Sequence, residues 1–323
     1  MEDQSPGSSG RPLDRVVAFL QHPLGLMAAA VTATLLWGSA FPFVKLGYAI
    51  ADISEHDIFL QLEFAGYRFT LAALLLMAVG IFIARKNLAA NARQLLFAAK
   101  IGSVQTFLQY TFFYIGLGLS SGISASVIAG SLTFFQIGLA HFIYHDDRIT
   151  ATKVIAALIG FSGIVFYQAM ENGLSLSFGP GELLMFAAMF CGALGNVLYR
   201  KAPAAGLFPL QLTALQMLMG GIGLIVVGAL KVGFVPFHVS GAFVLVLLYL
   251  SMLSATSFLI WNSIMTHNKA GGVSVYLFLI PIFGVILSAL VLHEQIKWFV
   301  FPALLLIAVS IVATQRAQAG RTH

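Results

Sequence analysis

The chain has 323 residues, of which only 9 % are charged while 59 % are hydrophobic. A soluble globular protein has roughly a quarter of its residues charged, so this chain cannot build a water-facing surface. The composition therefore excludes a soluble globular fold and predicts an integral all-α membrane protein. The net charge of +5 does not indicate a nucleic-acid partner, because the Lys and Arg residues form no dense run.

Uncharged apolar runs of membrane-spanning length recur from Leu24 onward. A helix needs about 20 apolar residues to cross the hydrocarbon core, and charges with Gly/Pro clusters bound the runs. The ten predicted transmembrane helices are 24–48, 59–84, 95–118, 123–144, 152–170, 180–199, 208–230, 241–265, 270–292 and 296–315. Polar tails, 1–23 and 316–323, flank them, and the run from Leu24 is too long for a signal peptide.

The basic residues test this helix count, because cytoplasmic loops of membrane proteins carry an excess of Lys and Arg. With the N-terminus in the cytoplasm, thirteen of the 17 basic residues fall on the inner side. The outer ends hold only Lys45, Lys231 and Lys297, and Arg68 lies inside a span. We therefore predict an even number of spans, with both tails in the cytoplasm.

The two halves of the chain repeat one another weakly. A shift of 147 residues lays SASVIAGSLTFFQIGLAHFIYHDDRI over GGVSVYLFLIPIFGVILSALVLHEQI, with Asp146 and Asp147 over His293 and Glu294. Five spans per half place the second half upside down relative to the first. We therefore predict two inverted five-helix repeats, 24–170 and 180–315. Chance similarity between apolar segments is the alternative.

These features resemble the drug/metabolite transporter superfamily, in its ten-helix branch built from two EamA-type repeats. The segments WGSAFPFVK, FAGYRF and VYLFLIPIFGVILSALVLHEQI carry the resemblance. The chain departs from the family at Phe134, where a proline is usual, and at His145-Asp146-Asp147, where Gly-Glu is usual. The resemblance implies a secondary transporter in a bacterial inner membrane that moves small metabolites by alternating access, often exporting amino acids.

Two prolines are predicted hinges. Pro42 has no amide hydrogen to donate to the carbonyl of Gly38, and non-helical backbone in a membrane is tolerated only against protein or a water-filled cavity. We expect helix 24–48 to break there and to turn Gly38 toward a central substrate cavity, with Trp37 and Phe41 as its walls. Pro281 is expected to do the same in helix 270–292. Harmless kinks are the alternative, because prolines are common in membrane helices.

Arg68 is the only basic side chain well inside a predicted span. A guanidinium in the membrane is costly unless it is paired, so it must face the bundle interior. We expect it either to bind a substrate carboxylate or to lock its helix to a neighbour, for example through an ion pair with Glu63.

Polar side chains near mid-membrane are further candidates, because each needs a partner there. The candidate substrate-binding side chains are Gln105, Gln109, Gln136, Asn196 and Tyr276. Interhelical hydrogen bonds between the amides are the alternative. His141 is a candidate for proton coupling, since it is the one titratable group in the inner half of a span; a neutral packed histidine is the alternative.

The leading hypothesis is a transporter that exports a small polar metabolite and uses no cofactor or metal. An intramembrane lipid- or sugar-modifying enzyme is the second, but it needs clustered acid and base groups, and the one such cluster, His145-Asp146-Asp147, is interpreted as a solvated loop. A channel is the third. The expected partners are the lipid bilayer and a small molecule. Gly118 and Gly122 form a small-xxx-small pair that packs helices within a monomer or between two copies of a homodimer.

Overall fold

The computed structural model describes residues 12–171, 173 and 178–319. Within them the first half of the chain forms five helical segments: α2 (Pro23–Ala51), α3 with η1 (Ile58–Ala78, Val79–Ile83), α4 with η2 and α5 (Ala92–Gly102, Ser103–Leu108, Gln109–Gly118), α6 with α7 (Gly122–Ala129, Ser131–Ile143), and α8 (Ala151–Glu171). The second half forms five more: α9 (Pro180–Tyr199), α10 (Pro209–Val232), α11 (Gly241–His267), α12 with η4 and α13 (Ala270–Val273, Ser274–Phe278, Leu279–Leu292), and α14 (Val300–Ala319). These segments correspond one to one with the predicted spans, and eight of the described helices are long and apolar enough to cross a membrane.

The largest error in the predicted bounds lies at the last helix, which begins at Val300 rather than at residue 296. The preceding helix ends at His293, whose φ of 55° lies in the left-handed region and turns the chain away from the helix axis. Residues 293–297 then run outside any helix, and they carry Glu294 to the start of α6, as described below.

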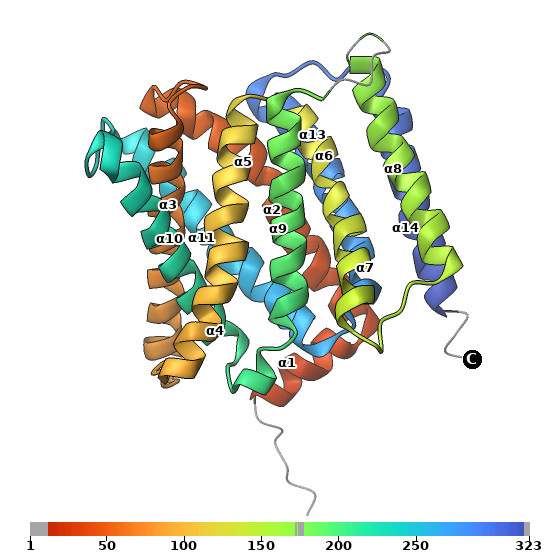
Figure 1. The fold of residues 1–323 in the computed structure, drawn as a ribbon, viewed down its shortest axis with the longest axis horizontal. Helices are drawn as coiled ribbons and strands as arrows, with labels where there is room; N and C mark the ends of the chain where they lie inside the picture. The colour runs from red at the N-terminus through yellow and green to blue at the C-terminus, as the bar shows by residue number, and fades with distance from the viewer. Residues whose placement is uncertain (1–11, 172, 174–177, 320–323) are drawn as a thin grey trace, which may run out of the picture.

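The helices pack in the pattern of two inverted repeats. Equivalent helices of the two halves form cross-repeat pairs, namely α3 with α10, α6 with α13, and α8 with α14. The first helix of one half also packs on the third helix of the other, as α2 on α11 and α5 on α9. The helices run between the two ends of the bundle, with α8 and α14 together at one edge (Figure 1). The fold is thus an all-α membrane bundle whose two halves meet along a seam.

Of the two breaks predicted at prolines, only the one at Pro281 has a counterpart in the backbone. Helix α2 stays α-helical from Pro23 to Ala51 through Pro42, so the predicted break there is wrong. Before Pro281 the backbone instead changes to the 3₁₀-helix η4, in which bonds close over three residues. Pro281 cannot donate to the carbonyl of Leu277, and the 3₁₀ segment ends next to that position.

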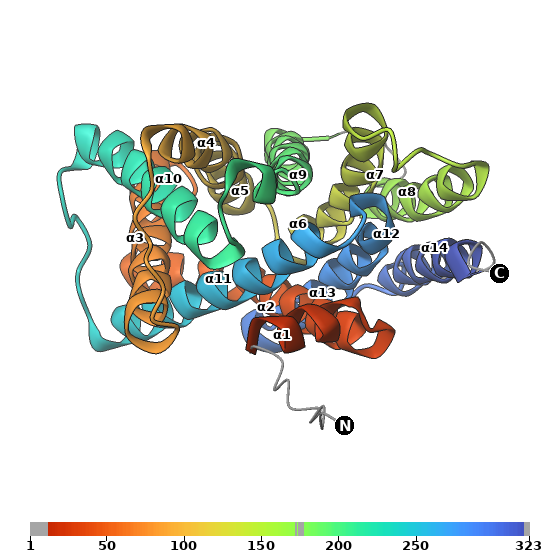
Figure 2. The same ribbon diagram turned by 90° about the horizontal axis from the view of Figure 1, so that it is seen from below.

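The N-terminal segment is helical where a polar tail was predicted. Helix α1 (Pro12–Gln21) lies across one end of the bundle, where it contacts α2 and α11 (Figure 2). Asn268 donates to the carbonyl of Leu20 at 3.4 Å and so attaches α1 to the end of α11. The remaining parts of the two predicted tails, residues 1–11 and 320–323, lie outside the described residues.

Close backbone approach between α3 and α10 depends on Gly66. A Cβ at Gly66 would lie 2.6 Å from the amide nitrogen of Ile225 and 2.9 Å from the carbonyl oxygen of Gly221. We expect Gly66→Ala to force these helices apart and to lower the free energy of unfolding by about 1–3 kcal/mol. Thermal unfolding in detergent measures the effect.

Gly138→Ala is the matched control, because a Cβ at Gly138 meets nothing within 4 Å. Both changes add one methyl group to a helix, so only the packing differs. Equal melting temperatures of the two variants would contradict the assigned role of the α3–α10 contact.

Candidate functional site

A cavity lies in the middle of the bundle, on the seam between the two repeats. Helices α2, α5, α6 and α7 of the first half and α9, α11 and α13 of the second contribute to its wall. The lining residues are Trp37, Ala40, Phe41, Gln109, Tyr110, Phe113, Ala129, Leu132, Met189, Gly192, Asn196, Phe258 and Ile280. The cavity volume is about 40 Å³, while one water needs roughly 10–15 Å³. The cavity in this structure has room for only a few waters, so a metabolite requires further opening.

Five of the thirteen residues that line the cavity are aromatic. Trp37 packs edge-on against Phe258, with ring centroids 5.2 Å apart, and against Trp261 at 5.5 Å. Phe41 packs against Phe113 with centroids 5.4 Å apart. Such rings form a largely apolar wall with few polar groups, which is the usual character of a small-molecule site. Trp37 and Phe41 therefore lie in the cavity wall, which is the position predicted for them.

Three of the predicted amides form a continuous hydrogen-bonded row. Gln105 Nε2 donates to Asn196 Oδ1 at 2.7 Å, and Asn196 Nδ2 donates to Gln136 Oε1 at 2.8 Å. Gln136 Nε2 then donates to Ser274 Oγ at 2.9 Å. The row joins η2, α9, α7 and η4, so interhelical bonding accounts for Gln105 and Gln136. Asn196 belongs both to this row and to the cavity wall.

Gln109 lines the cavity but does not belong to this hydrogen-bonded row. Its buried Oε1 has no hydrogen-bond partner among the described residues. Gln105 lies within the π-helix η2, and Gln109 follows directly after η2 at the start of α5. Local π-turns occur often at functional sites. A buried amide oxygen without a partner is costly unless a ligand or water reaches it.

Arg68 is fully buried and has no carboxylate partner among the described residues. Its Nε donates to Ser254 Oγ at 2.7 Å and to the carbonyl of Leu250 at 3.3 Å, and Nη1 donates to Tyr114 Oη at 3.2 Å. Nη2 is buried without a hydrogen-bond partner in the part of the chain that the structure describes. The guanidinium lies 5.6 Å from the ring centroid of Tyr110, which lines the cavity. Arg68 therefore joins α3 to α5 and α11 while its charge stays uncompensated.

The ion pair suggested between Arg68 and Glu63 is wrong. Glu63 Oε1 instead accepts the amide of Val235 at 3.2 Å, in the loop after α10. Both side chains are buried on α3, but they point to different neighbours.

The remaining predicted residues lie outside the cavity wall. Gly38 faces α13, where a Cβ would lie 2.6 Å from Phe283 Cβ, so it permits helix contact rather than substrate contact. Pro42 and Pro281 are buried within α2 and α13. Tyr276 is half-buried in η4. Met189, Phe258 and Ile280 also line the cavity, but they were not predicted, because apolar residues look alike in lipid, core and cavity.

His141 lies at the end of α7, away from the cavity wall. Its Nδ1 accepts the amide of Ile149 at 3.0 Å, which makes that nitrogen the unprotonated one. The ring thus fastens the loop after α7, as the packed-histidine alternative requires. Its proposed part in proton coupling has no support from this position.

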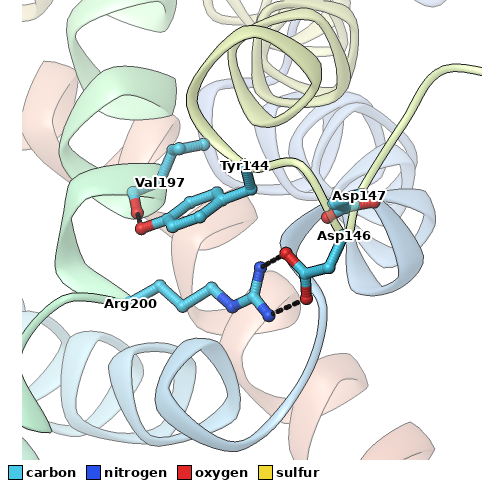
Figure 3. Close-up of polar contacts among 6 residues, drawn as sticks. Tyr144, Asp146, Asp147, Val197 and Arg200 are labelled. Atoms are coloured by element: carbon cyan, nitrogen blue, oxygen red, sulfur yellow. Dashed lines mark hydrogen bonds and ion pairs between the residues drawn. The ribbon is translucent and has the colours of Figure 1, made fainter.

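The His145-Asp146-Asp147 segment joins the two repeats at the end of the bundle (Figure 3). Arg200 donates to both oxygens of Asp146, at 3.1 and 2.6 Å, and holds the pKa of that carboxyl below its ordinary value. Tyr144 donates to the carbonyl of Val197 at 2.8 Å, and burial raises its pKa to about 12. The solvated-loop interpretation holds for half-exposed Asp146 but is wrong for Asp147, which is only 4 % exposed.

An inverted pair of membrane-spanning bundles around an aromatic cavity defines a membrane transporter rather than an enzyme. The model of the EamA-like transporter family matches residues 24–168 and again residues 179–315, and the chain belongs to this family. The uncharacterized transporter YvbV of Bacillus subtilis is 28 % identical over 86 % of this chain and 87 % of its own. A probable amino-acid metabolite efflux pump of Escherichia coli is 24 % identical over 86 % of this chain and 90 % of its own. A solved crystal structure, 17 % identical, superposes with a TM-score of 0.67 over 90 % of this chain and 96 % of its own, which shows the shared fold.

Asn196 and Gln109 give a matched test of the amide row. Asn196→Ala leaves Gln105 Nε2 and Gln136 Oε1 without their partners, and each unsatisfied buried group costs about 1–3 kcal/mol. Gln109→Ala breaks no hydrogen bond within the described residues. We expect thermal unfolding in detergent to show a large drop for Asn196→Ala and little change for Gln109→Ala. A reversed order would contradict the row as a structural element.

Proposed function

We propose that this transporter exports a small metabolite with a carboxylate, such as an amino acid, by alternating access. The observation that carries the proposal is the cavity on the seam, because both inverted repeats line it and their rocking can expose it to either side. The name of the Escherichia coli relative, a probable amino-acid metabolite efflux pump, supports the substrate class.

The charge distribution supports an orientation in a bacterial inner membrane. The end of the bundle that holds α1 also collects basic residues from the helix ends and loops: Arg85, Lys86, Arg93, Lys100, Arg148, Arg200, Lys201 and Lys269. The opposite end collects acidic residues: Asp52, Glu55, Asp57, Glu171, Glu182 and Glu294. Because cytoplasmic loops are enriched in Lys and Arg, we infer that the α1 end faces the cytoplasm.

The proposed substrate site combines an apolar wall with two polar groups. Trp37, Phe41 and Phe258 enclose the apolar part, and Gln109 offers its unpaired amide oxygen to the substrate ammonium. Arg68 supplies the charge for the carboxylate. The guanidinium packs against the ring of Tyr110, which lines the cavity, so we propose that this ring moves aside when Nη2 binds the substrate.

Transport tests the proposal directly. Proteoliposomes are loaded with radiolabelled amino acids in turn, and protein-dependent efflux of at least one is expected. Gln109→Ala, which is expected to leave stability nearly unchanged, should lower kcat/KM for that substrate about 10- to 100-fold, because a hydrogen bond to a charged group is worth about 1.5–3 kcal/mol. A large-conductance current in place of saturable flux would indicate a channel instead.

Arg68→Gln tests the carboxylate contact. Gln keeps donors for Ser254 Oγ but has no charge, so transport of the amino acid is expected to fall more than tenfold, because hydrogen bonds to charged groups are worth about 1.5–3 kcal/mol. The amide of the same amino acid, which has no carboxylate, is the control substrate. The acid and the amide are each tested as competitors of the radiolabelled amino acid, with the native protein and with Arg68→Gln. An equal loss of binding for acid and amide would assign Arg68 a purely structural role.

A further inference from the structure

The carboxylate of Glu294 lies against the start of α6, and the loop after α13 that carries it runs along the upper end of the bundle in Figure 1. Its Oε1 accepts the amide of Gly122 and its Oε2 the amide of Ile123, both at 2.8 Å. These amides open α6, and the first amides of a helix have no acceptor within it. A carboxylate there gains charge-assisted bonds and a favourable helix dipole. Glu294 follows α13, so this contact ties the second repeat to the first.

The carboxylate of Asp147 does the same at the lower end. Its Oδ2 accepts the amide of Gly271 at 2.6 Å, at the start of the span Ala270–Leu292. Asp147 follows α7, so this contact ties the first repeat to the second. Asp147 lies beside the Asp146–Arg200 ion pair (Figure 3), but its own carboxylate faces the opposite helix end.

The two contacts are equivalent under the internal repeat. Asp147 and Glu294 stand 147 residues apart, which is the shift that superposes the two halves of the sequence. Each carboxylate follows the fourth span of its own repeat and caps the fourth span of the other repeat. The contacts therefore lie at opposite ends of one helix pair, the spans Gly122–Ile143 and Ala270–Leu292.

This helix pair also forms part of the cavity wall. Ala129 on α6, Leu132 on α7 and Ile280 on α13 line the cavity between the two contacts. Separating the upper ends of the pair breaks both bonds of Glu294, and separating the lower ends breaks the bond of Asp147 to Gly271. Both contacts are closed in this structure, in keeping with the cavity volume of about 40 Å³.

We propose that Glu294 and Asp147 are the latches of two gates, each holding one side of the cavity shut and each released when the transporter opens to that side. This assignment rests on the proposed function, because the two gates open in turn only in a transporter that works by alternating access. The latch residues are positioning residues, since they act on the helix ends and do not touch the cavity. Each gate is held by one carboxylate that accepts hydrogen bonds from backbone amides. Neutralising one of the two carboxylates therefore weakens its own gate and leaves the other gate unchanged.

One-sided chemical labelling tests the latches without any transport assay. In a Cys191→Ala background, which removes the single cysteine, Ala129→Cys places a thiol on the cavity wall. A membrane-impermeant maleimide is then added to right-side-out or inside-out vesicles. Asp147→Asn is expected to speed labelling about tenfold from the lower side only, and Glu294→Gln about tenfold from the upper side only.

Three controls separate gating from loss of structure. Glu171→Gln removes an upper-end carboxylate that pairs with Lys297 at 2.8 Å, not with helix amides, and is expected to leave both labelling rates unchanged. The exchanges Asp147→Glu and Glu294→Asp keep the charge and are expected to restore slow labelling. Melting temperatures in detergent report any general loosening.

Unchanged labelling in Asp147→Asn and Glu294→Gln, or equal acceleration from both sides, would overturn the latches. Side-specific acceleration in a protein that moves no amino acid would support the latches while refuting the proposed substrate. Efflux of an amino acid without side-specific acceleration would support the proposed function while refuting the latches.

Discussion

The constraint on which the structure depends is that a buried polar group in a membrane has no water to bond, so its partner must come from another part of the protein. Two inverted repeats satisfy this constraint across their seam. Helix backbones approach closely at glycines such as Gly66, and side-chain amides bond between helices in the row centred on Asn196. The same seam also holds the cavity, and several buried polar atoms in or near its wall lack a partner among the described residues, among them Gln109 Oε1, Trp37 Nε1 and Arg68 Nη2.

Much of the fold follows from the sequence because membrane spans are long, and a window of about 20 residues averages out local ambiguity. The ten spans, their alternation and the register of the repeat were all predictable on this basis. The irregular segments within the helices were not predictable in this way. Pro42 and Pro281 carry the same local signal, yet only the segment before Pro281 becomes 3₁₀-helical, because neighbouring helices decide whether a missing hydrogen bond bends a helix.

The cavity wall was predictable in its polar part and at Trp37, which precedes Gly38, and Phe41, which precedes Pro42. Gln109 and Asn196 stood out because amides are rare and demanding in a membrane, and both line the cavity. Met189 and Phe258 did not, since nothing in an apolar side chain distinguishes a cavity from lipid. Glu294 shows an intermediate case: the repeat aligned it with Asp147, but only the folded structure shows that each caps a helix of the other repeat.

The placement of these two carboxylates bears on how leakage is avoided. The spans Gly122–Ile143 and Ala270–Leu292 run antiparallel and contact each other through α6 and α13. Gly284 on α13 leaves room for Ser126 on α6 to approach its backbone, so the two spans are in close contact between the two carboxylates. A rotation about that contact lengthens the distance at one end and shortens it at the other. When the carboxylate at one end of the helix pair forms its contact, it favours separation of the helices at the other end. Opening both ends at once breaks both charge-assisted contacts, and no new contact compensates for their loss.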